Sequence, residues 1–268
     1  MAILLILLVF LHFLVLGSYP RYSLLWISGP LILILLLFFS AMSVYYFLNC
    51  RLFSLLENEN WPALIRYLED RILQKGGYSS RLVRLLANCY LVLSDSAAVI
   101  SLENNVAIAK PDLVEANALI FGTARVLGKD IFGAMRFFES RRETARPEIK
   151  DWIRWYHGLT LLLAFQYEKA GEEFSFLAGI ANDRKSDGPV IAALSSYFLS
   201  QILSPFLPLK RPEYREISSS GRERVLKALP GLKNWNREIS RLSAEIHAAA
   251  ISKYMEETMN WLYGGKSL

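Results

Sequence analysis

The side chains that could act as catalysts or metal ligands are scattered along this 268-residue chain. Its three histidines, His12, His157 and His247, are far apart, and no Cys-x-x-Cys, His-Glu-x-x-His, glycine-rich phosphate loop or nucleophile-elbow motif occurs. Adjacent acidic pairs occur at 172–173 and 256–257, but neighbouring positions on a helix point about 100° apart. Such pairs are typical of solvated helix faces. The sequence therefore predicts no enzyme activity, no cofactor and no metal site.

A basic cluster lies in the middle of the chain. Its members are Arg141, Arg142, Arg146, Lys150 and Arg154, interspersed with acidic residues. The cluster is either a site for a partner or lipid or a solvated loop between helices, and the interspersed acids favour the loop. The whole chain carries 30 Lys and Arg against 25 Asp and Glu. That surplus is far too small for a nucleic-acid footprint, and two cysteines cannot form a disulfide scaffold.

The first 50 residues contain one formally charged side chain, Arg21. On either side of it, residues 2–19 and 23–48 are each long and apolar enough to cross a bilayer as a helix. The sequence therefore predicts a transmembrane helical hairpin over residues 1–49. The alternative for the first span is a cleaved signal peptide, although its start lacks the usual basic region.

The orientation of this hairpin follows from the basic residues that flank it. Arg51 and Arg66 follow the second span, and a hairpin places both of its ends on one side of the bilayer. Basic flanks favour the cytoplasmic side. We therefore expect the inner or plasma membrane, with the remaining domain in the cytoplasm.

An alanine followed four residues later by a larger side chain recurs beyond the hairpin. The pairs are Ala63–Tyr67, Ala98–Leu102, Ala134–Phe138 and Ala170–Phe174, with alanines 35, 36 and 36 residues apart. Gly122 and Gly158 each stand twelve residues before an alanine. Glycine in a first helix and alanine in a second would let the two approach closely, and the larger side chain would fill the space against the next unit. The pattern predicts stacked helix–turn–helix units, which bury their apolar faces only against neighbours.

This pattern resembles that of tetratricopeptide-repeat (TPR) proteins. The matching positions are Gly122, Ala134, Phe138, Gly158, Ala170 and Phe174, and the stretch QYEKAGEEF is similar to the second helix of that family. The chain departs from the family at Arg125 and Leu161, where the first-helix tyrosine is expected, and at Ala87, which replaces the glycine. Its period is 35–36 residues instead of about 34. Related helical-hairpin arrays are the alternative.

The resemblance also implies a binding groove, because the first helices of TPR arrays line a concave face. Here the groove would include Arg84, Asn88, Thr123, Trp152, Trp155 and Leu159. Arg84 and Asn88, four residues apart, resemble one half of the carboxylate clamp by which some family members hold a peptide C-terminus. Trp152 and Tyr156 stand where the other half is expected. The alternative is that these are surface and packing residues.

Together these features predict an all-α protein with an N-terminal transmembrane hairpin and a TPR-like α-solenoid over residues 50–203. A Pro/Ser-rich connection and a long C-terminal capping helix are expected over 204–268. The expected function is a membrane-anchored scaffold or adaptor that binds other proteins of a membrane-associated complex, for example a bacterial secretion or flagellar apparatus, and no nucleic acid. The oligomeric state is left open.

The sequence leaves two other functions open. One is a membrane-tethered assembly factor or chaperone-like receptor that binds client peptides. The other is an enzyme with an intramembrane site, which the lack of paired polar groups in the apolar spans disfavours.

Overall fold

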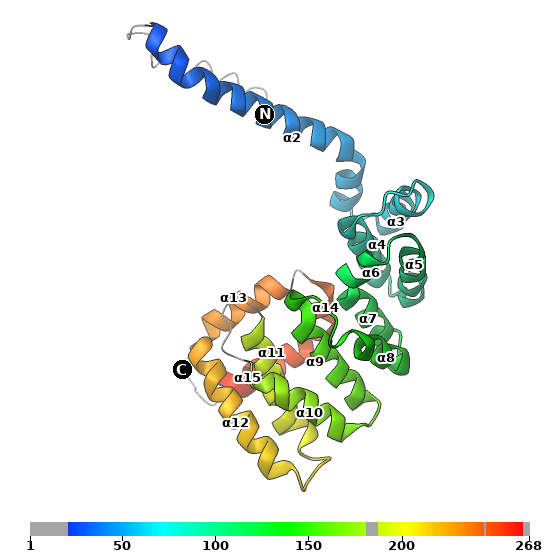
Figure 1. Cartoon of the computed structure of the whole chain (residues 1–268), viewed down its shortest axis with the longest axis vertical. Coiled ribbons are helices and arrows are strands. Elements are labelled where there is room, and N and C mark those ends of the chain that lie inside the picture. The colour runs from blue at the N-terminus through cyan, green and yellow to red at the C-terminus, as the bar shows by residue number, and fades with distance from the viewer. Residues whose placement is uncertain (1–20, 181–186, 244, 265–268) are drawn as a thin grey trace. The chain divides into compact units, whose positions relative to one another are not determined.

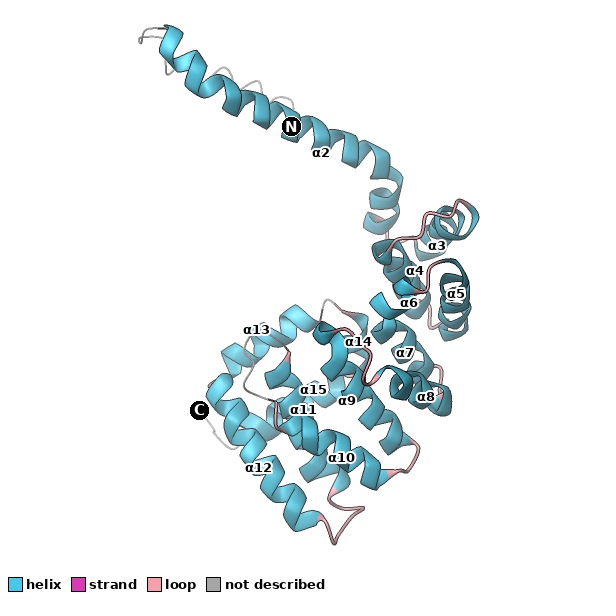
Figure 2. Ribbon diagram, in the orientation of Figure 1, coloured by secondary structure: helices cyan, strands magenta, loops and turns pink. Residues whose placement is uncertain are grey.

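The computed structural model of the chain describes residues 21–180, 187–243 and 245–264, without the side chains of residues 21–32 and 48. The described residues form helices joined by turns and contain no β-strand (Figure 2). The protein is therefore all-α, as predicted. It divides into two compact units, Met1–Asn60 and Trp61–Leu268. This division falls later than the expected boundary at residue 49, because the helix of the first unit continues to Glu57.

The described part of the first unit is the long helix α2 (Arg21–Glu57), which contains the second predicted span. The helix bends by 66° between Leu33–Phe47 and Asn49–Glu57. No single helix among the described residues is both long and apolar enough to cross a bilayer, whereas these two segments taken together meet that requirement by length and composition. The first predicted span, residues 2–19, lies outside the described residues.

The second unit consists of consecutive helix pairs (Figure 1). It begins with α3 (Trp61–Glu69), continued by the π-helix η1 (Asp70–Gln74). The pairs that follow are α4 (Ser80–Val92) with α5 (Ser96–Ala109), α7 (Ala118–Leu127) with α8 (Ile131–Arg141), and α9 (Pro147–Leu163) with α10 (Tyr167–Ala178). The short α6 (Asp112–Ala116) precedes α7. A further pair joins α11 (Gly188–Tyr197), extended by the π-helix η2 (Phe198–Leu203), to α12 (Arg211–Ala228). The chain ends in α13 (Leu232–Leu242), α14 (Ile246–Ala250) and α15 (Ser252–Tyr263).

The pairs stack side by side. The two helices of each pair pack against each other, and the second helix packs on the first helix of the next pair. The first helices also contact one another, α4 with α7, α7 with α9, and α9 with α11. They therefore form one continuous layer.

The same turn geometry recurs four times, after α2 and within the pairs α4–α5, α7–α8 and α9–α10. Among the described residues, the non-glycine residues with positive φ are Glu59, Ser94, Lys129 and Phe165, at 51°, 59°, 63° and 62°. They lie 35, 35 and 36 residues apart. The residue after each donates its backbone N–H to the carbonyl five residues earlier: Asn60 to Leu55, Asp95 to Tyr90, Asp130 to Arg125 and Gln166 to Leu161. A left-handed residue with this hydrogen bond is a common way for an α-helix to end and the chain to reverse.

These turns define the alignment of the pairs, which differs from the sequence pattern by one residue in the two earlier pairs. Ala134 and Ala170 follow their turn residues by five positions and are fully buried. The same position holds Leu64 and Val99, also fully buried, whereas the predicted packing residues Ala63 and Ala98 are part-exposed. The larger side chain shifts likewise from Tyr67 to Leu68, whereas in the next pair Leu102 is buried as predicted and Glu103 beside it is buried too. A shift of one residue rotates a side chain by about 100° around the helix. Ala63 and Ala98 therefore keep the repeat spacing but lie next to the fully buried position.

Gly122 and Gly158 each lie against a phenylalanine of the following helix and not against an alanine. The nearest atoms to a Cβ placed on Gly122 all belong to the ring of Phe138. A Cβ on Gly158 would lie 3.0 Å and 3.1 Å from two ring atoms of Phe174 and 3.3 Å from Cβ of Glu173. The same contact therefore recurs in two successive pairs, and Ala170 is not the partner of Gly158.

The C-terminal region differs from the sequence expectation in two ways. Residues 211–221, expected in a Pro/Ser-rich connection, belong to α12. Pro212 lies in its first turn, where a missing backbone donor costs little, and Tyr214, Ser218, Gly221 and Val225 form its buried stripe. The expected long capping helix is instead three helices, α13 to α15, with an extended residue, Glu245, before α14. The breaks let α14 pack on α7 while α15 packs on α11, two contacts that a single straight helix would not combine.

Candidate functional site

The expected groove lies on one face of the first-helix layer. The C-terminal helices α14 and α15 pack against this layer. Tyr156 on α9 donates its hydroxyl hydrogen to the carbonyl oxygen of His247 on α14, at 2.7 Å. The His247 ring packs edge-on against Trp152, with ring centroids 5.2 Å apart. Further along the layer, Phe198 meets Tyr254 of α15 at 5.0 Å between centroids. The chain therefore covers this face with its own C-terminal segment.

Four of the six predicted groove residues are consequently buried. Thr123, Trp152, Trp155 and Leu159 are at most 3% exposed. Trp152 donates its indole N–H to Asp187 at 2.7 Å, and the Trp155 ring packs against Phe198 at 5.4 Å. These four side chains are packing residues, the alternative that the sequence left open. A peptide has no access to them while the C-terminal helices are in place.

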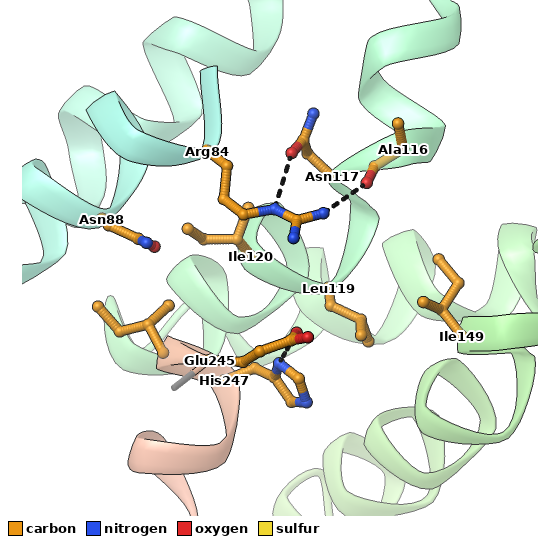
Figure 3. Close-up of a pocket in the computed structure, with 10 residues that line it drawn as sticks. Arg84, Asn88, Ala116, Asn117, Leu119, Ile120, Ile149, Glu245 and His247 are labelled. Atoms are coloured by element: carbon orange, nitrogen blue, oxygen red, sulfur yellow. Dashed lines mark hydrogen bonds and ion pairs between the residues drawn. The ribbon is translucent and has the colours of Figure 1, made fainter. Parts of the chain in front are cut away.

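The other two predicted groove residues, Arg84 and Asn88, do lie together and line a pocket of about 150 Å³ (Figure 3). Its other walls come from Ile149 on α9, from residues 245–247, and from four residues around the start of α7: Ala116, Asn117, Leu119 and Ile120. The Arg84 guanidinium donates to the Asn117 side chain and to the Ala116 carbonyl, both at 3.5 Å, the outer limit of a hydrogen bond. The buried side-chain oxygen of Asn88 has no hydrogen-bond partner among the described residues.

Glu245 supplies this pocket with a carboxylate from the chain itself. It enters from the wall opposite Arg84 and lies next to His247, with 3.3 Å between its Oε2 and the imidazole Nδ1 (Figure 3). The hydrogen bond from His247 lowers the pKa of Glu245 against the opposing effect of burial, and the charges of His247 and Arg84 lower it further. Glu245 therefore already interacts electrostatically with Arg84. In a carboxylate clamp, the carboxylate of a bound peptide would take this place.

The basic cluster is used inside the fold. Arg142, at 2.7 Å, and Arg154, at 2.5 Å, both bond to the buried carboxylate of Glu173, and His157 lies 3.3 Å from it. Burial alone would raise the pKa of Glu173, but hydrogen bonds from His157, Arg154 and Arg142 outweigh it and lower the pKa to about 2. Arg141 and Lys150 pair with Glu115 and Glu143. Four of the five cluster residues therefore form ion pairs within the fold, and Arg146 is exposed.

Glu173 belongs to an acidic pair for which the sequence predicts a solvated face, whereas its side chain is buried. A signal was nevertheless present, because Glu173 precedes a packing phenylalanine and follows a segment rich in arginine. Over residues 21–180, 187–243 and 245–264, no group of three or more His, Cys, Asp or Glu side chains could hold a metal ion.

Comparison with known proteins identifies relatives of this chain. A family model described as "Uncharacterised Treponema protein" matches residues 98–264. A protein of Treponema pallidum (strain Nichols), described as an uncharacterized protein, is 25% identical over 242 residues, which cover 88% of this chain and 75% of the relative. No solved structure matches significantly. The range matched by the family model runs from α5 to α15, and so includes both the covered face from α7 onward and the helices that cover it.

Proposed function

The chain belongs to the family of Treponema proteins whose model matches residues 98–264, and on that premise we propose that it is a membrane-anchored, TPR-like scaffold. In this proposal it binds other proteins of a membrane-associated complex and does no chemistry. The observation that carries the proposal is the turn repeated at Glu59, Ser94, Lys129 and Phe165. A chain built from stacked helix pairs presents extended edges and faces, which helical-repeat proteins use for binding.

The membrane anchor is supported by the first unit. Large apolar side chains along Leu33–Phe47 are exposed, among them Ile34 at 64%, Leu37 at 63% and Phe47 at 79%. Soluble proteins rarely expose a continuous apolar surface of this kind, and a bilayer would bury it. Arg51, directly after the apolar stretch, favours a cytoplasmic second unit.

The covered face favours a scaffold over a receptor for client peptides. A peptide could enter the expected groove only if the hydrogen bond between Tyr156 and His247 broke and the rings of Trp152 and Trp155 were uncovered. Burying aromatic side chains of this size contributes several kcal/mol. A receptor that binds and releases clients would have to spend that free energy at each encounter.

Fractionation tests the anchor. The full chain should stay in membranes washed with alkaline carbonate, whereas residues 61–268 should be soluble. For the orientation, Ile108→Cys is made in a Cys50→Ser background, because Ile108 is 86% exposed while Cys89 is buried. A membrane-impermeant maleimide should label it only after spheroplasts are lysed. Labelling of intact spheroplasts would reverse the orientation, and a fragment that remains in the membrane without aggregating would place the anchor elsewhere.

Crosslinking and purification from membranes test the scaffold. A scaffold should bring down one set of proteins in fixed stoichiometry, and a receptor many clients in small amounts. The variant Arg84→Ala with Asn88→Ala opens the pocket without touching the buried aromatic residues, and the scaffold proposal expects it to leave the complex intact. Loss of many clients in this variant would favour the receptor.

A further inference from the structure

The pocket that Arg84 and Asn88 line has opposite charges on its two sides. Arg84 and Asn88 reach into it from α4, and Glu245 and His247 lie on the other side (Figure 3). Of the ten described residues that line the pocket, Arg84 and Glu245 are those with a formal charge when histidine is neutral. Within the part of the chain that the structure describes, these two form no ion pair with each other. The pocket is therefore neutral as a whole, with a cation and an anion held apart.

Both charged groups have hydrogen-bonding capacity left for a ligand. Arg84 is exposed, and its two hydrogen bonds within the chain are at 3.5 Å, the outer limit. Oε2 of Glu245 lies 3.3 Å from Nδ1 of His247, whereas its Oε1 has no hydrogen-bond partner among the described residues. The charge of Arg241 also acts on Glu245, but Arg241 is paired with Asp187 at 2.6 Å. A ligand could therefore bind to both charges without breaking a strong contact of the fold.

The pocket also holds buried polar atoms that lack a partner. The side-chain oxygen of Asn88 is one of them, and Nε2 of His247, a residue only 3% exposed, is another. Buried polar groups in native proteins are almost always hydrogen-bonded, because an unsatisfied one is costly. An amide oxygen accepts and does not donate. Asn88 therefore needs an N–H or O–H donor that the described residues do not supply.

The remaining lining is aliphatic and sets the size of a ligand. It consists of Leu119, Ile120, Ile149 and Ile246, with Ala116 at the edge. The pocket volume is about 150 Å³, and a cavity of about that size holds a molecule of about six heavy atoms such as benzene. Ligand sites commonly combine an apolar lining with a few polar groups that fix the orientation of the ligand. A fitting ligand is therefore small, with an aliphatic part and two opposite charges.

We propose that this pocket binds a free α-amino acid with a small aliphatic side chain. The planar guanidinium of Arg84 would donate two parallel hydrogen bonds to the carboxylate. The ammonium group would donate to Glu245, which also neutralises its charge, and to the oxygen of Asn88. The side chain of the amino acid would pack on the aliphatic lining. The inference goes beyond the proposed scaffold function, because it concerns the chain by itself and requires no partner protein.

Calorimetric titration of the full chain in nanodiscs tests the inference, with empty nanodiscs as the blank. The probe is L-valine, and two analogues each lack one of its charges: N-acetyl-L-valine has no ammonium group and L-valinamide has no carboxylate. We expect saturable binding of L-valine at one site. Each analogue should bind about tenfold more weakly or worse, because it leaves one charge of the pocket without a partner. Saturating L-valine should also raise the Tm of the chain, since it binds the folded state.

Two variants locate the binding in this pocket. Glu245→Gln and Arg84→Ala should each raise the Kd of L-valine about tenfold or more, because each removes a charge-assisted hydrogen bond. Both residues are exposed, so the fold should survive, and circular dichroism checks this. The matched controls are Glu256→Gln on α15 and Arg215→Ala on α12, which make the same changes at exposed positions outside the pocket. The controls should leave the Kd unchanged.

Four results would overturn the inference. The first is the absence of saturable binding of L-alanine, L-valine and L-leucine to the wild-type chain. The second is equal binding of L-valine and N-acetyl-L-valine, which would make the occupant the C-terminus of a peptide. The third is equal binding of L-valine and L-valinamide, which would make it a simple amine. The fourth is an unchanged Kd in both pocket variants, which would place the bound valine elsewhere.

Discussion

Replacing Gly122 with alanine should destabilise the second unit far more than the same replacement at Gly158. The new methyl group at Gly122 would overlap the end of the Phe138 ring. That ring is fully buried, stacks on Tyr156 at 5.3 Å and packs edge-on against Phe137 at 5.6 Å. Because it has no room to retreat, we expect the upper end of the overpacking range, about 3 kcal/mol. Alanine is more favourable than glycine within a helix by about 1 kcal/mol. The free energy of unfolding should therefore fall by about 2 kcal/mol in total.

At Gly158 the same methyl group would meet its neighbours at 3.0 to 3.3 Å. The Phe174 ring then needs to move only slightly, at a cost of about 1 kcal/mol. The gain in helix propensity offsets this cost, so Gly158→Ala should change the free energy of unfolding by no more than about 0.5 kcal/mol. The two variants make the same chemical change at equivalent positions of successive pairs and differ only in the space available.

The assay is thermal unfolding of residues 61–268 followed by circular dichroism, with a cooperative melt of the wild-type fragment as its starting condition. A loss of about 2 kcal/mol corresponds to a Tm lower by roughly 4–8 °C for a unit of this size. Adding Phe138→Leu to Gly122→Ala should recover part of the loss, because the smaller side chain removes the overlap. Equal shifts for the two alanine variants, or no recovery in the double variant, would refute the proposed contact.

Three further outcomes are expected from the same fragment. Glu173→Gln should cost about 3 kcal/mol, because it leaves Arg142 and Arg154 without their counter-charge. The folded pKa of Glu173 is about 2, against an ordinary 4.5. The stability that its charge contributes is therefore complete above about pH 5 and is lost as the pH falls toward 2. Urea titrations at several pH values should show this loss of stability in the wild-type fragment and not in Glu173→Gln. Tyr156→Phe removes the hydrogen bond to the C-terminal segment and should lower the free energy of unfolding, measured with urea, by about 1 kcal/mol. Phe165→Asn relieves left-handed strain and should raise the Tm by the equivalent of about 1 kcal/mol, so a fall in Tm would contradict the strain argument.

The repeated pairs could be predicted from the sequence because each turn is a local event. Gly122, Gly158 and the phenylalanines sixteen residues after them carry the period, and the helix ends follow from it within a few residues. The alignment of the two earlier pairs could not be predicted as well. Their alanines at 63 and 98 keep the spacing, but Leu64 and Val99 hold the buried position.

That the C-terminal segment covers the first-helix layer could not be predicted from local sequence patterns. α12 escaped prediction for a separate reason, because it buries small and polar residues such as Ser218 and Gly221 and its buried stripe is not apolar. Trp152 and Trp155 point to an aromatic face, but whether solvent, a peptide or the chain itself covers such a face depends on residues about ninety positions away. The hydrogen bond from Tyr156 to His247 spans 91 residues, and no periodicity encodes it.

That span has a consequence for how the protein is made. A ribosome adds roughly 5–20 residues per second, so about 5–20 s pass between the synthesis of Tyr156 and that of His247. During this interval the earlier helix pairs have left the exit tunnel while the surface around Trp152 has nothing to cover it. The nascent chain then offers an aromatic face to chaperones, or to a neighbouring nascent chain on the same message. A chain truncated by a stop codon between α10 and α14 should therefore aggregate more than the full-length chain.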